Sequence, residues 1–187
     1  DGRIYLIGAN SNDKVGIARL RADGSPDTSY GSAGTGQVEL DLNVNPNSPV
    51  AGRRQSNGKL VVAVERENGH AICRVTSAGE LDDSFGNPQT PACHVFPGDI
   101  ELTSVPFFPA LDVLHDDTII VAGIQNNGPV LFRFDSQGQP HAVFGINGKK
   151  TLNLPKVAIT DIAEASNGQL VFSSYNSEAG KSGVIRL

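Results

Sequence analysis

The densest group of residues that could do chemistry lies in one short segment: Asp112, His115, Asp116 and Asp117. Carboxylates beside an imidazole could ligate a hard cation or provide a general base. However, the pair at 116–117 occupies the place that Asn-Gly takes at 57–58 and at 167–168. Asn-Gly supplies the positive φ angles of a tight hairpin turn. Turn geometry therefore accounts for this pair, and the sequence predicts no metal site here.

The two cysteines, Cys73 and Cys93, could form a disulfide, remain unrelated buried thiols, or bind zinc together with His70 and His94. Zinc is disfavoured because side chains alternate between the two faces of a strand. Cys73 lies three residues after His70, and His94 directly follows Cys93, so each pair points to opposite faces. Cys73 and Cys93 themselves lie on strands that we expect to be antiparallel neighbours, where cross-strand positions suit a disulfide. We predict this disulfide, which is typical of an oxidising compartment.

The remaining motifs give no catalytic residue and no cofactor. Gly180-Lys181-Ser182 imitates the end of a phosphate-binding loop, but Tyr175 stands where the first glycine of that motif belongs. The sequence contains no G-x-S-x-G elbow, H-E-x-x-H helix, C-x-x-C pair or calcium-loop pattern. An enzyme is therefore disfavoured, although a site assembled from several repeats would escape such a linear search.

A repeated element must position all of these residues. The twelve-residue stretch 75–86 (VTSAGELDDSFG) recurs with variations at 20–31 and 134–145. Its terminal aromatic-glycine pairs align at Tyr30, Phe85 and Phe144, with spacings of 55 and 59 residues. Self-similarity at such a period indicates a repeat architecture. The aromatic-glycine end predicts a side chain plugged into the core over a close backbone approach.

Two further positions of the repeat carry charge. An arginine ends the second strand of each copy, at Arg19, Arg74, Arg133 and Arg186. Four equivalent arginines could line a binding site, but we favour a solvent-side or inter-repeat salt bridge, since such pairs are commonly structural. An aspartate stands at Asp27 and Asp82, and His141 replaces it in the third copy. We interpret these aspartates as turn caps that accept backbone N–H groups.

Each copy reads as short strands with turn signals between them, and no segment has helical periodicity. Fourteen strands are expected in all, at a density of four per roughly 40 to 60 residues, which is typical of a propeller blade. The sequence thus predicts an all-β chain, a β-propeller built from four-stranded antiparallel blades, with about three and a half blades. We expect one domain over 1–187, with repeats at approximately 1–49, 50–109 and 110–159 and a partial repeat at 160–187.

The segments DGRIYLIG at 1–8 and ARLRADGSPDTSYG at 18–31 resemble the delta-60 repeat, a bacterial β-propeller repeat typical of secreted or surface proteins. The resemblance extends over essentially the whole chain. It implies a secreted, periplasmic or cell-surface bacterial protein. It implies no particular chemistry, because propellers host many unrelated functions.

The charge and composition exclude some partners. With 15 basic and 20 acidic residues the net charge is -5, and no basic tract occurs, so nucleic-acid binding is disfavoured. No apolar run is long enough to span a membrane. The chain contains no methionine, so we expect that Asp1 is not a native translation start and that a leader, an upstream segment or a cloning boundary precedes it.

The segment 96–110 breaks the repeat most clearly. Its three prolines beside Phe107 and Phe108 could form an exposed aromatic contact surface, or the two phenylalanines could pack between blades. We name Phe107 and Phe108 as candidate binding residues. The function predicted is a non-catalytic binding or scaffold module that contacts a protein or a glycan through propeller loops. The alternative is an extracellular hydrolase or lyase with a site at the propeller funnel.

The blade count raises the question of ring closure, since a closed propeller usually has at least four blades. Either further blades lie upstream, or two chains meet as a homodimer that closes a seven-bladed ring. The dimer is attractive because it would cover end strands that otherwise risk aggregation.

Overall fold

The computed structural model describes residues 2–46, 48–67, 69–102 and 109–187. Those residues form β-strands and turns, without a helix. The strands are β1 (Ile4–Ala9), β2 (Val15–Leu20), β3 (Gln37–Leu40), β4 (Ala51–Arg54), β5 (Leu60–Arg66), β6 (Gly69–Val75), β7 (Gly86–Asn87), β8 (Thr90–Pro91), β9 (Cys93–Val95), β10 (Leu111–Val113), β11 (Ile119–Gln125), β12 (Gly128–Phe134), β13 (Lys149–Thr151), β14 (Val157–Glu164), β15 (Leu170–Asn176) and β16 (Lys181–Arg186).

The strands pair with their sequence neighbours in antiparallel meanders. Sheet 1 is β1-β2-β3, sheet 2 is β4-β5-β6-β9, sheet 3 is β10-β11-β12-β13 and sheet 4 is β14-β15-β16. All fourteen predicted strands are present in these four sheets. The short pair β7-β8 was not predicted, because two residues a strand are too few for an alternating pattern.

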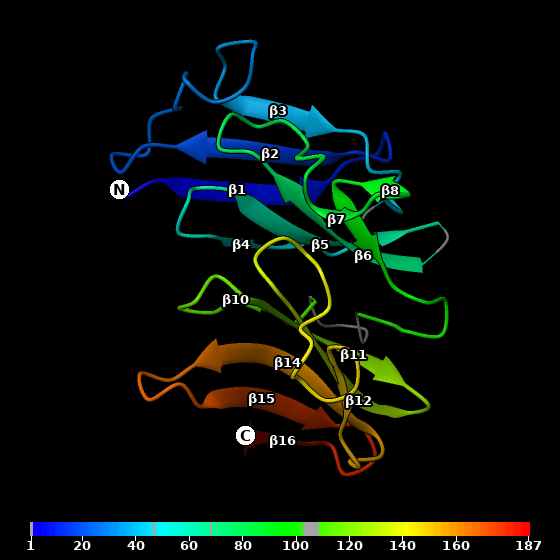
Figure 1. The fold of residues 1–187 in the computed structure, drawn as a ribbon. Coiled ribbons are helices and arrows are strands. Elements are labelled where there is room, and N and C mark those ends of the chain that lie inside the picture. Colours follow the sequence, from blue (N-terminus) through cyan, green and yellow to red (C-terminus); the bar gives the residue numbers. More distant parts are fainter. Residues whose placement is uncertain (1, 47, 68, 103–108) are drawn as a thin grey trace.

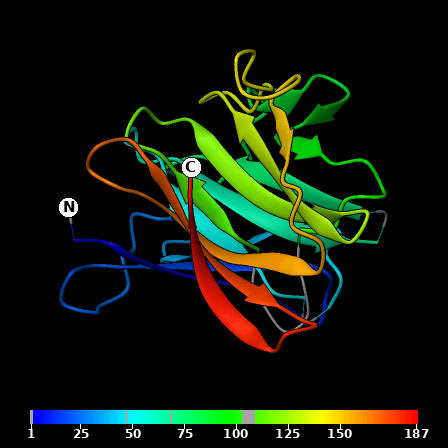
Figure 2. The same ribbon diagram turned by 90° about the horizontal axis from the view of Figure 1, so that it is seen from below.

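The four sheets follow one another in chain order, with sheet 1 and sheet 4 at opposite ends (Figure 1). Strand β4 contacts β1 on one side and β10 on the other, and β10 also contacts β14. We call these four the inner strands. Seen at right angles, the sheets fan out from one another (Figure 2).

Apolar side chains fill the space between consecutive sheets. Each of the three buried clusters joins one sheet to the next. One pair of repeat-equivalent positions meets in every cluster: Ile17 with Val62, Ile72 with Val121, and Leu131 with Phe172. Face-to-face packing of successive small sheets is the arrangement that blades of a propeller adopt.

The repeated twelve-residue stretch connects two strands of its own sheet, and its aromatic residue packs against the next repeat. The predicted close approach is confirmed. Tyr30 and Phe85 are buried at 0% and 1% exposure. The turn of the following repeat lies against each ring, since a Cβ on Gly79 would come within 3.1 Å of Tyr30 and one on Gly138 within 2.6 Å of Phe85. Phe144, the third aromatic, is only half-buried.

The predicted disulfide is confirmed: Cys73 of β6 is bonded to Cys93 of β9. The two residues face each other in the register of these antiparallel strands. Both are buried in the cluster between sheets 1 and 2. The bond therefore ties the outermost strand of sheet 2 to its neighbour.

Replacing both cysteines by alanine is expected to lower the free energy of unfolding by about 3 kcal/mol, because the bond restricts a loop of 20 residues in the unfolded chain. Urea denaturation of the oxidised protein and of the double variant measures this. Dithiothreitol should shift the unfolding midpoint of the native chain but leave that of the variant in place. Equal midpoints for the oxidised protein and the variant would contradict the prediction.

Candidate binding site at the inner strands

The repeated arginines are structural groups rather than free ligands. Arg19 is buried and its Nε donates to Asp27 at 2.9 Å. Its other nitrogens donate to Ser29 Oγ at 3.0 Å and to the carbonyl oxygen of Ser77, in the turn of the next repeat, at 2.7 Å. The guanidinium also lies over the Tyr30 ring, 4.5 Å from its centroid. The expectation of a solvent-side or inter-repeat salt bridge is wrong for Arg19: its salt bridge is buried and lies within one repeat, and its contact to the next repeat is a hydrogen bond to a carbonyl oxygen.

Arg74 repeats this arrangement in the second copy. It is 0% exposed, and its Nε donates to Asp82 at 2.7 Å. It also donates to the carbonyl oxygen of Ser136 at 2.5 Å, again in the turn of the next repeat, and lies over Phe85. Arg74 thus links sheets 2 and 3, because it donates both to the Asp82 carboxylate and to the Ser136 carbonyl oxygen.

The aspartates do more than cap turns. Asp27 and Asp82 accept the backbone N–H of Ser29 and Ser84, as predicted. Each also binds two cations: Arg3 and Arg19 for the first, Lys59 and Arg74 for the second, in contacts of 2.7 to 3.0 Å.

These contacts explain the acidity of both carboxyl groups. The Ser29 hydroxyl, and then Arg3 and Arg19, hold the pKa of Asp27 well below its ordinary value against the opposing effect of burial. Burial acts to raise the pKa of Asp82, but Lys59, Ser84 and Arg74 outweigh it and lower the pKa strongly. Both groups are therefore charged at neutral pH and serve as fixed anions.

The third copy exchanges the charges between two positions. His141 stands where the other copies have aspartate, and Thr118 stands where they have Arg3 and Lys59. Arg133 instead donates to Asp116 Oδ2 at 3.0 Å and to Thr118 Oγ1. In the third copy, the acid that pairs with Arg133 is therefore Asp116 of the hairpin turn.

The group at 112–117 does not converge on one point. Asp117 has the positive φ of a turn, 62°, as predicted, and accepts from the backbone N–H and hydroxyl of Ser56. His115 Nδ1 lies 2.7 Å from Glu164. Within the described part of the chain, no three His, Cys, Asp or Glu side chains gather as a metal site would require.

Asp112 belongs to another cluster, which the sequence did not show. Arg53 on β4 lies between Asp112 on β10 and Asp161 on β14, with nitrogen-oxygen distances of 3.5 Å to each. The three residues come from the inner strands of three consecutive sheets. Because they are separated by 59 and 49 positions, only the fold brings them together.

A cavity of about 420 Å³ opens beside this cluster. Its polar lining comes from Tyr5, Arg53, Thr160 and Asp161, and its apolar lining includes Ile7, Val50 and Pro109. Strands of sheets 1, 2 and 4 therefore contribute to one hollow. The surface that lines this hollow is mainly polar, so it offers a ligand hydrogen bonds more than apolar contact.

Burial raises the pKa of the Asp112 carboxyl, and the neighbouring Asp161 acts in the same direction. Arg53 and the N–H of Val113 oppose this shift without cancelling it. Asp112 is therefore a partly buried acid with a raised pKa, and Arg53 lies between it and Asp161. Such perturbation is frequent at functional sites.

The other candidates from the sequence lie elsewhere. Phe107 and Phe108 are outside the described residues, so their role as binding residues stays a prediction. His94 packs against Phe96 and Phe134, with burial lowering its pKa. Gly180 forms the exposed hairpin turn between β15 and β16, so the resemblance to a phosphate loop has no structural counterpart.

The comparisons with known proteins define the class of fold. A family model for a domain of unknown function, DUF5122, described as a β-propeller, matches residues 1–30 and 55–85. Each matched range ends at the aromatic residue of the repeated stretch. The predicted fold class is confirmed: the chain is all-β and has the β-propeller fold.

A solved structure supports the same fold. The crystal structure of a quinonprotein alcohol dehydrogenase-like protein from Bacteroides thetaiotaomicron matches 99% of this chain with a TM-score of 0.54 and 12% sequence identity. The chain spans 41% of the length of that protein. At this identity the likeness concerns the fold alone. A search of curated proteins finds no significant match.

The described segments contain no helix with the length and apolar character needed to cross a membrane.

Proposed function

We propose that this chain is a non-catalytic binding or scaffold module of a secreted or cell-surface bacterial protein, built from repeats of the delta-60 type. The disulfide between Cys73 and Cys93 supports an oxidising location. The buried arginines and aspartates of the repeat support a structural role for its most regular polar residues, because they serve the joints between sheets.

One observation carries the binding role: polar side chains from three sheets meet at the cavity beside Arg53. Between a protein and a glycan as partner, we favour the glycan. A hollow of about 420 Å³ admits a sugar unit. Arg53 can donate to ring oxygens and hydroxyls, Asp161 can accept from hydroxyls, and Tyr5 offers an aromatic surface.

Arg53→Ala is expected to weaken oligosaccharide binding about tenfold or more, because a hydrogen bond from a charged group is lost. The native chain and the variant are compared on an array of immobilised neutral and acidic oligosaccharides. Lys150→Ala is the matched control, since this exposed cation lies on β13, away from the cavity. Absence of binding by the native chain, or equal binding by Arg53→Ala, would contradict the glycan proposal.

The second candidate function is an extracellular hydrolase or lyase at the same end of the sheets. The raised pKa of Asp112 favours it, because a general acid must hold its proton near the working pH. Release of product from any oligosaccharide that the array retains tests this candidate. Loss of product release in Asp112→Asn with binding preserved would support the enzyme, and an intact ligand after incubation would rule it out.

A further inference from the structure

Strand β14 carries an irregularity beside the Arg53 cavity that the other inner strands do not share. Its pairing with β15 shifts between Ile159 and Asp161, so Thr160 is the extra residue of a β-bulge. Strands β1, β4 and β10 pair with their neighbours without such a shift. Consecutive residues of a regular strand point to opposite faces, yet Thr160 and Asp161 both line the cavity. The bulge therefore turns a hydroxyl and a carboxylate toward one hollow, and bulges are frequent beside ligand sites for this reason.

The Asp161 carboxylate keeps much of its capacity to accept hydrogen bonds. Its side chain is 66% exposed, and its Oδ1 accepts the N–H of Ile162 at 3.0 Å and lies 3.5 Å from Arg53. The buried ion pairs of the repeat are closer, at 2.7 to 3.0 Å. Thr160 Oγ1 lies 2.7 Å from Ser173 Oγ, which leaves the Thr160 hydroxyl a further hydrogen bond. Both groups can therefore bind a ligand hydroxyl.

Arg53 is the matching donor. Its side chain is 41% exposed, and it donates to the carbonyl oxygen of Gly52 at 3.1 Å. Its distances of 3.5 Å to the carboxylates of Asp112 and Asp161 exceed the roughly 2.7–2.9 Å of a strong charge-assisted hydrogen bond. The guanidinium is thus held in place between two acids and still has N–H groups to offer a ligand.

The charges at the cavity disfavour an acidic ligand. Arg53 is the only cation among the described residues that line the hollow, and it faces two carboxyl groups, Asp112 and Asp161. Burial raises the pKa of Asp112, but with or without that proton the positive charge of Arg53 is balanced. A ligand carboxylate would find no unbalanced cation and would be repelled by Asp161. A neutral ligand with several hydroxyls meets acceptors on one side and donors on the other.

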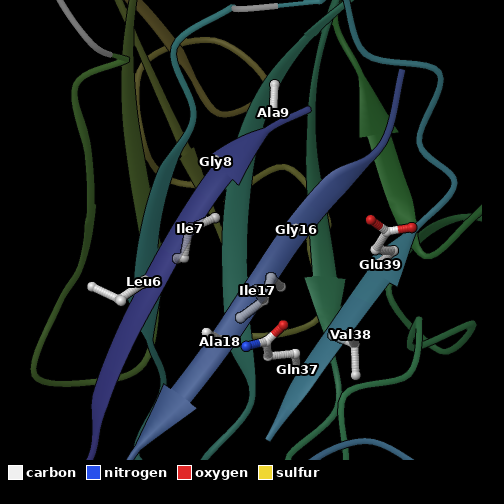
Figure 3. A pocket seen from close by; sticks show the side chains of 10 residues that line it. All are labelled: Leu6, Ile7, Gly8, Ala9, Gly16, Ile17, Ala18, Gln37, Val38 and Glu39. Atoms are coloured by element: carbon white, nitrogen blue, oxygen red, sulfur yellow. The ribbon is translucent and has the colours of Figure 1, made fainter. Parts of the chain in front are cut away.

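A larger groove of the molecule lacks this arrangement. It has a volume of about 540 Å³ and follows β1, β2 and β3 (Figure 3). Among the described residues that line it, the polar side chains are Gln37 and Glu39, both on β3, and none is a cation. The fixed pairing of a donor with acceptors from different sheets therefore distinguishes the Arg53 cavity.

We infer that the Arg53 cavity selects a neutral sugar with hydroxyl groups on adjacent ring carbons and rejects uronic and other acidic sugars. This inference rests on the proposed glycan function and names the class of ligand. Asp161 and Thr160 accept from one hydroxyl, and Arg53 donates to the oxygen of the next. Asp161 determines the specificity, because its charge is the exposed one that a ligand carboxylate would meet.

Paired arrays test the inference on the full chain. They carry neutral glucose, galactose and mannose oligosaccharides, each beside its uronate counterpart of the same length. The native chain is expected to bind a neutral oligosaccharide about tenfold or more tightly than the uronate counterpart. Asp161→Asn keeps the shape of the side chain but removes its charge, so it should reduce this ratio about threefold or more. Added salt should reduce the ratio of the native chain in the same direction.

Asp83→Asn is the matched control, since Asp83 is exposed and does not line the cavity, and its ratio should equal that of the native chain. Circular dichroism checks that both variants stay folded. A uronate bound as tightly as its neutral counterpart, with both weakened in Arg53→Ala, would overturn this inference and leave the glycan function in place. An unchanged ratio in Asp161→Asn would overturn the assigned role of Asp161. Absence of binding to every oligosaccharide would overturn the glycan function and this inference together.

Discussion

Asp82→Ala is expected to destabilise the fold by about 3–5 kcal/mol, the cost of leaving a buried charge without its partner. Arg74 is 0% exposed, and its Nε donates to this carboxylate. Arg74 also donates to the Ser84 hydroxyl and to the Ser136 carbonyl oxygen, but neither of these acceptors carries a negative charge that could replace the carboxylate. Lys59 also pairs with Asp82 but can turn to solvent. Chemical denaturation followed by circular dichroism measures the change.

Asp116→Ala is the matched control for this prediction. It removes the acid that pairs with Arg133, the equivalent arginine of the third copy, but Asp116 is exposed. Exposed pairs contribute about 1 kcal/mol or less. A loss for Asp82→Ala no larger than that for Asp116→Ala would show that burial of the pair is not what stabilises the joint.

The pH dependence gives a second measure of the same pair. The folded-state pKa of Asp82 lies below its ordinary value of 3.8, so its stabilising effect is fully present above about pH 5 and is lost as the pH falls below 4. The difference in unfolding free energy between the native chain and Asp82→Asn should therefore shrink on acidification. A difference that stays constant down to pH 3 would contradict the assigned ion pair.

The sequence predicted the strands well because each repeat states its pattern several times. Asn-Gly and Asp-Gly turns, the aromatic-glycine ends and the alternating apolar runs agreed among the copies, so a single ambiguous copy could be resolved from the others. The disulfide followed from the same alignment, since it placed Cys73 and Cys93 on neighbouring strands. Turns, strands and strand neighbours that recur in each copy of the repeat can be recognised from the sequence alone.

The partnership between Arg74 and Asp82 was missed, although the sequence contained a signal for it. Arginine and aspartate stand eight residues apart in the first two copies, and the copy with His141 has Asp116 at the turn position, where the second copy has Asn57. Such a compensating exchange indicates contact between the positions. The aspartates looked like turn caps because capping needs only local spacing, whereas burial of the pair depends on the next sheet.

The Arg53 cluster had no sequence signal at all. Arg53, Asp112 and Asp161 do not occupy one position of the repeat: Arg53 and Asp112 are equivalent, but Asp161 reaches the cluster after a register shift in β14. Asp112 was grouped with its sequence neighbours at 115–117, although its side chain points to another sheet. Proximity along the chain was therefore misleading here, because inner strands meet across sheets.

Gly138→Ala is expected to destabilise the fold by about 4 kcal/mol, through two effects that a second glycine separates. The residue has φ of 80°, where a Cβ costs about 1–2 kcal/mol. Its Cβ would also lie within 2.6 Å of the buried Phe85 ring, and such overpacking adds about 1–3 kcal/mol. Thermal and urea unfolding of the variant give the total.

Gly24 is the matched control, since it occupies the same repeat position with φ of 83° but a Cβ there would meet no atom within 4 Å. Gly24→Ala should therefore show only the backbone cost of about 1–2 kcal/mol. The difference between the two variants measures the joint between sheets 2 and 3. Because Phe85 receives the turn of the next repeat, Phe85→Leu should reduce the excess cost of Gly138→Ala, whereas additive effects would show that the ring and the glycine do not share one contact.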